Sequence, residues 1–367
     1  MKRRCAAGFT ALALLVCAVA WGRLGREVTL SRESFAMNTL ISLSVTGGEE
    51  QARSALDEAF ACLERLDGEL SLYDEGSVLS EIGRRAGEKE PLSVPAGVFA
   101  AVAKAQEMCR LTDGVFNPLI GPVTKLWKIN RSPDSPESFT LPGQASLDAA
   151  LVLSDPGGLE LQPDGEGGGR VRLARRGAAL DLGGIAKGYA STRLVELLRT
   201  RGISSALLNL GGNIHVLGTK GSAPWNIGIR NPLLSANEPI ALVVEVNDAE
   251  RRGMAVVTSG GYERYRIVNG VRYSHFFDPR TGMPVQNDLL SATLISPDGA
   301  LADALATAFM VMGSERARVF LAAHSELEAI LIRRSAAGGL DILATKNLRG
   351  RIRRALGPVG DVSDEAI

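Results

Sequence analysis

The sequence predicts an α+β fold with mixed or antiparallel sheets. Strand-like segments and helical segments alternate along the chain, hairpin-like pairs of strands are frequent, and no short internal repeat is found. The chain has 367 residues, of which 45% are hydrophobic. That is enough to bury one large core or two smaller ones.

The first half of the chain alternates strand and helix patterns. Residues 27–46 alternate as one strand until Gly47-Gly48, and residues 49–66 then carry apolar side chains at helical spacing. A second helix is predicted over 95–111, with Pro95 near its start and one apolar stripe. The stripe is formed by Val98, Ala101, Val102, Ala105, Met108 and Cys109.

Two polar stretches follow. Residues 129–147 are rich in Pro, Ser and Asp and predict a surface loop, and the glycine-rich residues 155–170 predict a hairpin or an inserted loop. A strand over 178–182 is then expected to lead through Gly183-Gly184 into a helix over 185–201. The next strand, 206–210, stops at Gly211-Gly212.

The second half is richer in strands. They are expected at 225–230, 239–246, 254–259 and 264–268. Ala302 to Met312 forms an apolar helix pattern, and residues 327–346 predict a terminal hairpin. The charged residues 349–367 are expected to form a mobile tail.

The N-terminus has the pattern of an export signal. Met1-Lys2-Arg3-Arg4 is followed by a mostly apolar run, and Ala18-Val19-Ala20 fits a signal peptidase site. Residues 1–20 are therefore expected to be a signal peptide or an anchor. An uncleaved membrane helix and lipidation at Cys17 remain open alternatives. The protein is expected to be exported to the periplasm or attached to the periplasmic face of the inner membrane.

Charge and cysteine content exclude some function classes. Lys plus Arg equals Asp plus Glu at 41 each, and aromatic residues make up 5%. Neither the balanced charge nor the low aromatic content favours nucleic-acid binding. Removal of residues 1–20 leaves 38 basic against 41 acidic residues, with Cys62 and Cys109. These two cysteines could pair in an oxidising compartment or act as buried thiols. No cysteine motif indicates a zinc or iron–sulfur site.

Asp303 and Thr307 are the first candidate site. They lie four residues apart and share a face on a helix. A carboxylate and a hydroxyl are hard oxygen ligands that suit Mg²⁺. The alternative is structural: Asp303 could cap the helix, and Thr307 could bond back to a helical carbonyl.

A second candidate runs from Asp181 to Tyr189. Its glycines allow the backbone to approach a ligand closely, and the following helix N-terminus favours an anion such as a pyrophosphate. Lys187 lies in the first turn of this helix, where its charge opposes the helix dipole, which favours a phosphate-binding role. An ordinary glycine turn with a solvated lysine is the alternative.

The third candidate contains Thr258-Ser259-Gly260 and the run from His275 to Pro284. Asp278-Pro279-Arg280-Thr281-Gly282 predicts a turn, and His275 can move protons near neutral pH. A lone histidine is also often structural. His215 and His324 lack such a neighbourhood and are expected to be structural.

In order and spacing, these segments resemble the ApbE family of FAD:protein FMN transferases. The resemblance spans residues 27–348. The other matching segments are Met37-Asn38-Thr39, Ser71-Leu72-Tyr73, residues 112–118 and residues 209–214. The family implies two interlocked α/β lobes with mixed, largely antiparallel sheets.

The resemblance also implies roles for particular residues. The backbone carbonyl of Gly184 and the side chains of Asp303 and Thr307 would bind Mg²⁺. FAD, as substrate, would be contacted by Met37, Tyr73, Val115, Phe116, Asn117, Asp181, Lys187 and Phe277. His275 is expected to accept the proton, with Asp303 and its surroundings as the second choice.

The implied reaction transfers FMN from FAD to a threonine or serine hydroxyl of a target protein and releases AMP. Typical targets are flavoprotein subunits of membrane redox complexes. Two other functions stay open: a magnesium-dependent FAD pyrophosphatase, and a non-catalytic periplasmic FAD-binding protein.

Three positions depart from the family pattern, and each loses a carboxylate. Asn117, Asn213 and Gly261 stand where the family often has aspartate. None of them is an expected magnesium ligand.

Overall fold

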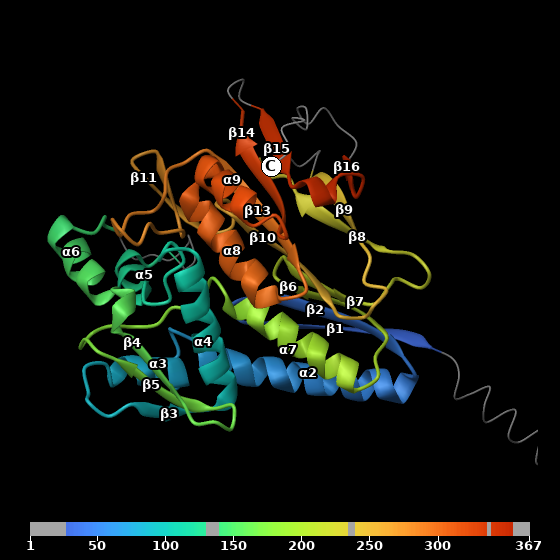
Figure 1. The fold of residues 1–367 in the computed structure, drawn as a ribbon, viewed down its shortest axis with the longest axis horizontal. Coiled ribbons are helices and arrows are strands. Elements are labelled where there is room, and N and C mark those ends of the chain that lie inside the picture. The colour runs from blue at the N-terminus through green and yellow to red at the C-terminus, as the bar shows by residue number, and fades with distance from the viewer. Residues whose placement is uncertain (1–26, 130–138, 234–238, 336–338, 355–367) are drawn as a thin grey trace, which may run out of the picture.

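An eight-stranded sheet forms the centre of the molecule (Figure 1). The computed structural model describes residues 27–129, 139–233, 239–335 and 339–354. In sheet order, the strands are β1 (Val28–Ala36), β2 (Thr39–Gly47), β6 (Ser205–Leu210), β7 (Asn213–Leu217), β10 (Met254–Gly260), β13 (Leu289–Ser296), β14 (Glu328–Arg334) and β15 (Leu340–Ala344). Each neighbouring pair is antiparallel. This confirms the predicted α+β class.

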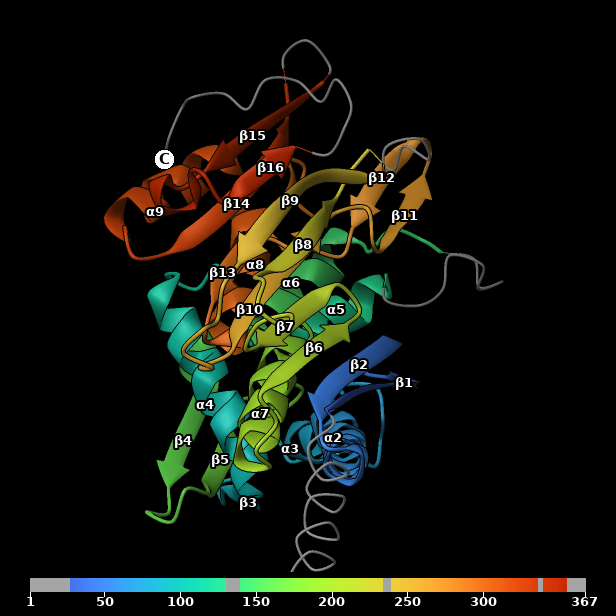
Figure 2. The same cartoon turned by 90° about the vertical axis from the view of Figure 1, so that its right-hand side faces the viewer.

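Three helices cover one face of this sheet: α2 (Glu49–Leu70), α7 (Ala186–Thr200) and α8 (Gly299–Met312) (Figures 1 and 2). The buried side of β2, including Leu43 and Val45, shares a core with α2 and α7. The small residues of α8, such as Ala302 and Ala306, pack in a core with Val257 and Ala292. Small side chains let α8 lie close to the sheet, which brings its polar residues near the strand ends.

A second sheet lies on the opposite face. It contains β8 (Trp225–Arg230), β9 (Ile240–Val246) and β16 (Ile352–Arg354). Ile227 and Val244 of this sheet share a core with Val256 and Ile330 of the large one. Because β16 pairs with β9, residues 352–354, which were expected to belong to the tail, are part of a sheet. Residues 355–367 lie outside the described part.

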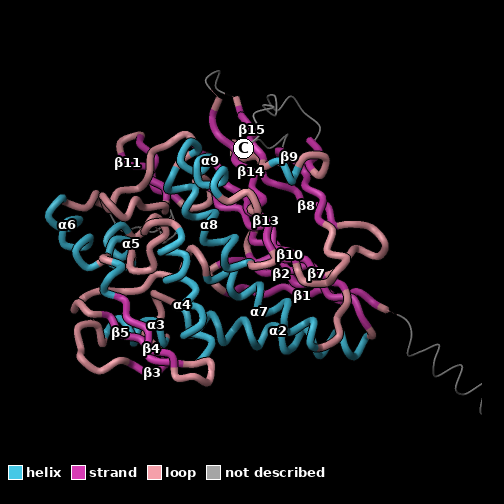
Figure 3. The backbone as a smooth tube through the Cα atoms, in the orientation of Figure 1, coloured by secondary structure: helices cyan, strands magenta, loops and turns pink. Residues whose placement is uncertain are grey.

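Most of the remaining elements lie at one end of the large sheet, where Figure 3 shows short helices and loops gathered together. A small sheet there has the order β3-β5-β4, and β11 and β12 form a separate hairpin. The elements at this end are α3 (Val78–Arg84), β3 (Leu92–Val94), α4 (Ala96–Leu111), α5 (Gly121–Trp127), α6 (Gln144–Leu153), η1 (Pro156–Gly158), β4 (Leu159–Pro163), β5 (Gly169–Leu173), β11 (Tyr265–Val268) and β12 (Val271–Ser274). Away from this end, α9 (Ser314–Ala323) packs against α8 and β14, and η2 (Lys346–Leu348) precedes β16.

The prediction of one strand over 27–46 was wrong. The chain turns at Met37 and Asn38, which both have positive φ (50° and 60°), and β1 pairs with β2 in a hairpin. The signal that was missed is a change in the phase of the alternating burial pattern between β1 and β2. The less exposed positions are even-numbered in β1 and odd-numbered in β2, as Leu30 and Leu43 show.

The strand predicted over 178–182 was also wrong. Ala178, Leu180 and Leu182 are buried, but the segment belongs to no sheet. It is held instead by a hydrogen bond from the Asp181 N–H to the Pro118 carbonyl (2.8 Å). Ala179 is buried as well, so a run of buried apolar residues produced a strand-like pattern without a strand.

Several other predictions are confirmed. The helices over 49–66, 95–111 and 185–201 correspond to α2, α4 and α7, and the six apolar stripe residues of α4 are all buried. The hairpins are β4–β5 and β14–β15. The predicted loop over 129–147 ends in α6 from Gln144, and its residues 130–138 lie outside the described part.

Cys62 and Cys109 are both free thiols, and burial raises the pKa of Cys109 to about 11. Within residues 27–354, as far as they are described, no helix is long and apolar enough to cross a membrane. The expected signal peptide or anchor, residues 1–20, lies outside the described part.

Candidate active site

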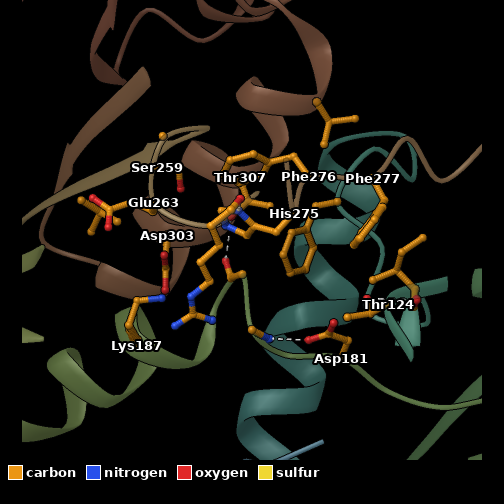
Figure 4. A pocket seen from close by; sticks show the side chains of 18 of the residues that line it. Thr124, Asp181, Lys187, Ser259, Glu263, His275, Phe276, Phe277, Asp303 and Thr307 are labelled. Carbon is orange, nitrogen blue, oxygen red and sulfur yellow. Dashed lines mark hydrogen bonds between the residues drawn. The ribbon is translucent and has the colours of Figure 1, made fainter. Parts of the chain in front are cut away.

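One pocket collects most of the predicted site residues (Figure 4). It opens between the starts of α5 and α7, the second half of α8, and the end of β10. Ten of the predicted residues line it: Val115, Phe116, Asn117, Asp181, Gly184, Lys187, His275, Phe277, Asp303 and Thr307. The fold therefore brings together segments that lie far apart in the sequence.

Met37 and Tyr73 are not part of the pocket wall. Met37 lies in the β1–β2 turn, next to Asn38, whose carbonyl accepts a hydrogen bond from the Arg264 guanidinium (3.2 Å). Thr39, two residues after Met37, does line the pocket. Tyr73 is 53% exposed.

Asp303 is a buried carboxylate in the second turn of α8, only 3% exposed. It does not cap the helix, because Asp298 fills that position and accepts a hydrogen bond from the Leu301 N–H (3.0 Å). One oxygen of Asp303, Oδ2, accepts a hydrogen bond from the Gly188 N–H of α7 (2.8 Å). The carboxylate is thus fixed across two helices at the pocket wall.

Thr307 lies one turn further along α8. Its hydroxyl donates to the Gly184 carbonyl at 3.4 Å rather than to a carbonyl of its own helix. A Cβ on Gly184 would lie 3.0 Å from Thr307 Oγ1 and 3.2 Å from a ring carbon of Phe116. The close approach of these two segments therefore favours glycine at position 184.

The three predicted metal donors consequently meet at one wall of the pocket. They offer a carboxylate, a hydroxyl and a backbone carbonyl, which are hard oxygen ligands of the kind that Mg²⁺ prefers. The described residues contain no cluster of three or more His, Cys, Asp or Glu side chains suited to a metal. The oxygen donor set at the pocket wall fits a hard cation.

Gly188 of α7 and Gly299 of α8 lie where the two helices cross, and their close contact holds this wall in place. A Cβ on Gly188 would lie 2.0 Å from the Gly299 carbonyl oxygen and 2.6 Å from Asp303 Cβ. The Gly299 N–H donates to Thr192 Oγ1 (3.0 Å), and Thr192 Oγ1 donates to the Gly188 carbonyl (3.1 Å). Backbone contact between the helices therefore sets the position of Asp303.

The Asp181–Lys187 segment forms the adjoining wall. The Asp181 carboxylate accepts a hydrogen bond from the Gly183 N–H (2.8 Å) and so shapes the glycine turn that presents the Gly184 carbonyl. Lys187 lies in the first turn of α7, and Figure 4 shows its side chain on the same side of the pocket as Asp303. A cation near three oxygen donors suits a bound phosphate together with its metal ion.

His275 faces the pocket from the segment after β12. Its Nδ1 lies 3.0 Å from the Arg264 carbonyl oxygen. Because a carbonyl can only accept, Nδ1 carries the proton and Nε2 is left as a free base. Burial, which outweighs the opposing effect of the bond to the Arg264 carbonyl, lowers the pKa of His275 to about 4, with smaller contributions from the charges of Arg264 and Lys187. His275 is therefore neutral at pH 7.

The predicted turn after His275 is confirmed. The Asp278 carbonyl accepts from the Thr281 and Gly282 N–H groups (3.1 and 2.8 Å). Arg280 binds the Asp278 carboxylate (2.7 Å), and this hydrogen bond lowers the pKa of Asp278. Phe277 is buried, with its ring centroid 6.1 Å from that of Trp127, so the turn anchors the apolar side of the pocket.

The side chain of Asn117, one of the residues expected to contact FAD, is bonded within the protein. Its Nδ2 donates to the Ser154 carbonyl (2.7 Å), and its Oδ1 accepts from the Leu119 N–H (2.9 Å). Both ends of the carboxamide are thus used within the protein. Asn117 therefore shapes the pocket wall, and a ligand could contact its other atoms.

Several polar residues of the pocket were not predicted as site residues, among them Thr124, Asn213, Glu263 and Arg264. Asn213 begins β7, directly after the Gly211-Gly212 turn, and Arg264 precedes β11. The sequence pattern alone does not distinguish a pocket residue at the end of a strand from a solvated polar residue. Position was the available signal, since Asn213 follows a glycine turn and Arg264 lies four residues after Gly260, where β10 ends.

Comparisons with known proteins agree with this arrangement. The ApbE family model matches residues 37–331. An FAD:protein FMN transferase of Treponema pallidum (strain Nichols) is 34% identical over 335 residues, covering 88% of this chain and 89% of that protein. One of Klebsiella pneumoniae (strain 342) is 33% identical, covering 82% of this chain and 88% of that protein.

Solved structures show the same fold. The flavin transferase ApbE of Vibrio cholerae has a TM-score of 0.76 at 25% identity, covering 89% of this chain and 100% of that chain. The ApbE protein of Thermotoga maritima also has a TM-score of 0.76, at 27% identity and with the same coverage. The sequence match, the fold and the pocket lead to one conclusion: this chain belongs to the ApbE family and is a transferase enzyme of that family.

Proposed function

We propose that this protein is a magnesium-dependent FAD:protein FMN transferase. It moves FMN from FAD to a threonine or serine hydroxyl of a target flavoprotein and releases AMP. The observation that carries the proposal is the meeting of the Gly184 carbonyl, Asp303 and Thr307 beside Lys187 in one pocket of an ApbE-family chain.

In this proposal Gly184, Asp303 and Thr307 hold Mg²⁺. The fit rests on their chemistry and on Asp303, whose Oδ2 is bonded to Gly188 while the structure gives Oδ1 no hydrogen bond from the described residues. When bound, the ion would offset negative charge on the diphosphate of FAD. Lys187 adds a second positive charge on the same side, which strengthens binding of the diphosphate.

Transfer requires an oxygen of the target to attack the FMN-side phosphorus. The new bond joins this oxygen to phosphorus, and the bond to the AMP phosphate breaks. The hydroxyl proton goes to Nε2 of His275, because Nδ1 is occupied by its bond to the Arg264 carbonyl. The pocket residues thus bind, orient and accept a proton.

The location and the targets follow from the N-terminus and from the family. Residues 1–20 carry the pattern of an export signal or anchor, which supports a periplasmic enzyme or one attached to the inner membrane. Suitable targets are then flavoprotein subunits of membrane redox complexes whose acceptor hydroxyl faces the periplasm.

The test uses the protein without residues 1–20, FAD, Mg²⁺ and a target domain that bears the acceptor threonine. AMP release and covalent flavin on the target are both measured. AMP with labelled target supports the transferase. AMP without label supports a pyrophosphatase, in which water replaces the hydroxyl, and bound FAD without AMP contradicts both enzymes.

A further inference from the structure

Asn213 is a buried polar side chain without a partner. It is 2% exposed, and both its Oδ1 and its Nδ2 lack a hydrogen bond within the described part of the protein. An unsatisfied buried polar group destabilises the folded protein. Such groups are rare in folded proteins and need an explanation. Asn213 lines the pocket, so a bound ligand can supply the missing partners.

Strand register shows which part of the pocket Asn213 faces. Asn213 and His215 lie two residues apart in β7 and so point to the same face of the sheet. His215 Nδ1 lies 3.0 Å from Ser191 Oγ of α7. Further along both elements, Val195 lies beside Gly253, which directly precedes the residue of β10 that pairs with Val216. β7 and α7 therefore run in the same direction. Because Asn213 precedes His215 in β7, it lies beside the turn of α7 that precedes Ser191.

That turn contains Lys187 and Gly188. Gly188 holds Asp303, and Lys187 lines the same pocket as Asn213. No hydrogen bond or ion pair joins the side chain of Lys187 or of Asn213 to another residue of the described part of the chain. The Lys187 ammonium and the Asn213 carboxamide therefore lie at the same height along α7 and β7. Both border the place where the proposed metal donors meet.

The backbone fixes Asn213 in this position. The β6–β7 turn uses Gly211 and Gly212 at positive φ (64° and 89°), and the Gly212 N–H donates to Asn209 Oδ1 (2.9 Å). On its other side Asn213 pairs with Val257 of β10. A side chain held on two paired strands needs little reordering when a ligand binds.

We propose that Asn213 binds the diphosphate of the dinucleotide substrate. Its Nδ2 donates to a non-bridging phosphate oxygen, and its Oδ1 accepts from the Lys187 ammonium, which binds the same diphosphate. This assignment rests on the proposed function. It makes Asn213 a substrate-binding residue that recognises the linkage shared by dinucleotides rather than the flavin or adenine ring.

The amide at this position matters because it offers both a donor and an acceptor, whereas an ionised carboxylate of the same shape offers only acceptors. An aspartate, which the family often has here, could not donate to phosphate when ionised and would repel it. The present chain should therefore bind a diphosphate in the absence of metal better than its Asn213→Asp variant does.

The experiment measures affinity by calorimetry in the presence of EDTA, so that turnover does not interfere. The probes are FAD and ADP, which carry a diphosphate, and riboflavin, which carries none. Asn213→Ala should weaken both FAD and ADP binding about tenfold, the scale of a hydrogen bond to a charged group. Asn213→Asp should weaken them further, and riboflavin binding should be unchanged in both variants.

Ser291→Ala is the matched control. Ser291 is also buried with an unpartnered hydroxyl, but it does not line the pocket. Ser291→Ala should leave the affinities for FAD, ADP and riboflavin unchanged. The melting temperature of Asn213→Ala should not fall, because the variant loses an unpaired polar group, and this separates a binding role from a structural one.

The outcomes are distinct. Undiminished FAD affinity in Asn213→Ala, or an equal loss for riboflavin, overturns the assignment of Asn213 while leaving the proposed function intact. A wild-type protein that binds FAD and ADP only when Mg²⁺ replaces EDTA also overturns the assignment of Asn213, which requires binding without metal. A wild-type protein that binds neither FAD nor ADP even with Mg²⁺ contradicts the proposed function itself.

Discussion

The Asp303 carboxylate accepts a hydrogen bond from the backbone N–H of Gly188, which lies 115 residues earlier in the chain, at 2.8 Å. The bond joins the first turn of α7 to the second turn of α8. The bond occupies one carboxylate oxygen, and the other is the one that the proposed Mg²⁺ would bind. The proposed metal donors therefore come together only when the two helices pack.

Asp303→Asn should abolish Mg²⁺ binding and magnesium-dependent AMP release. The amide keeps the shape of the side chain but removes the charge on which a hard cation depends. Calorimetric titration with Mg²⁺ in the presence of ADP measures the loss. Asp298→Asn is the matched control, since asparagine also caps a helix and position 298 lies outside the pocket. Unchanged Mg²⁺ affinity in Asp303→Asn removes this residue from the metal site.

Gly188→Ala should lower both stability and Mg²⁺ affinity. The new methyl group would lie 2.0 Å from the Gly299 carbonyl oxygen, so α7 and α8 must separate. Overpacking of this kind typically costs about 1–3 kcal/mol. Chemical denaturation gives the free energy of unfolding.

Gly68→Ala in α2 is the control for that substitution. A Cβ at Gly68 meets nothing within 4 Å, so alanine should stabilise the helix by about 0.5–1 kcal/mol. If Gly188→Ala behaves in the same way, the close contact between the two helices is not what positions Asp303.

His275 should remain neutral well below pH 6 in the protein without ligand. Its pKa is lowered to about 4, first by burial and then by the charges of Arg264 and Lys187. Its imidazole signals in NMR should therefore titrate near pH 4, with assignment from His275→Gln. The same variant should lose transfer activity because it lacks the base at Nε2. A pKa near 6.5 would show that the ring is solvated rather than held in the pocket wall.

His215 should make the protein less stable as pH falls. Ser191 Oγ donates to the Gly188 carbonyl and accepts from His215 Nδ1, so Nε2 is bare, and burial lowers the pKa of His215 to about 3. Below pH 6.5 the unfolded state binds a proton that the folded state does not. The free energy of unfolding then falls by up to about 1.4 kcal/mol per pH unit, until the pH reaches the folded pKa.

The comparison of wild type with His215→Asn isolates this effect, since asparagine can still donate toward Ser191. Denaturation at pH 7 and pH 5 should show a smaller loss of stability in the variant. An equal loss in both proteins contradicts the assignment of a buried neutral His215.

Much of the fold was predictable from periodicity. The stripe of α4 and the strand β8 were predicted to the residue, because in them one face is buried and the pattern is uninterrupted. The β1–β2 turn was missed because Met37-Asn38 lacks glycine, which usually marks a turn with positive φ.

The candidate site was predictable in its parts but not in its connections. Spacing placed Asp303 and Thr307 on one helical face, and the family resemblance added Gly184. The Gly188–Asp303 bond and the free carboxamide of Asn213 depend on how α7, α8 and β7 pack. No local pattern encodes contacts across 115 residues, so only the structure could show them.

The most direct test of the account is the intact mass of a threonine-bearing target domain after incubation with this protein and FAD, with Mg²⁺ or with EDTA. The account predicts a mass increase of one FMN phosphoester with Mg²⁺, none with EDTA, and none when Asp303→Asn replaces the wild type. An unmodified target in Mg²⁺, or equal modification in EDTA, would contradict a metal-dependent transferase built on Gly184, Asp303 and Thr307.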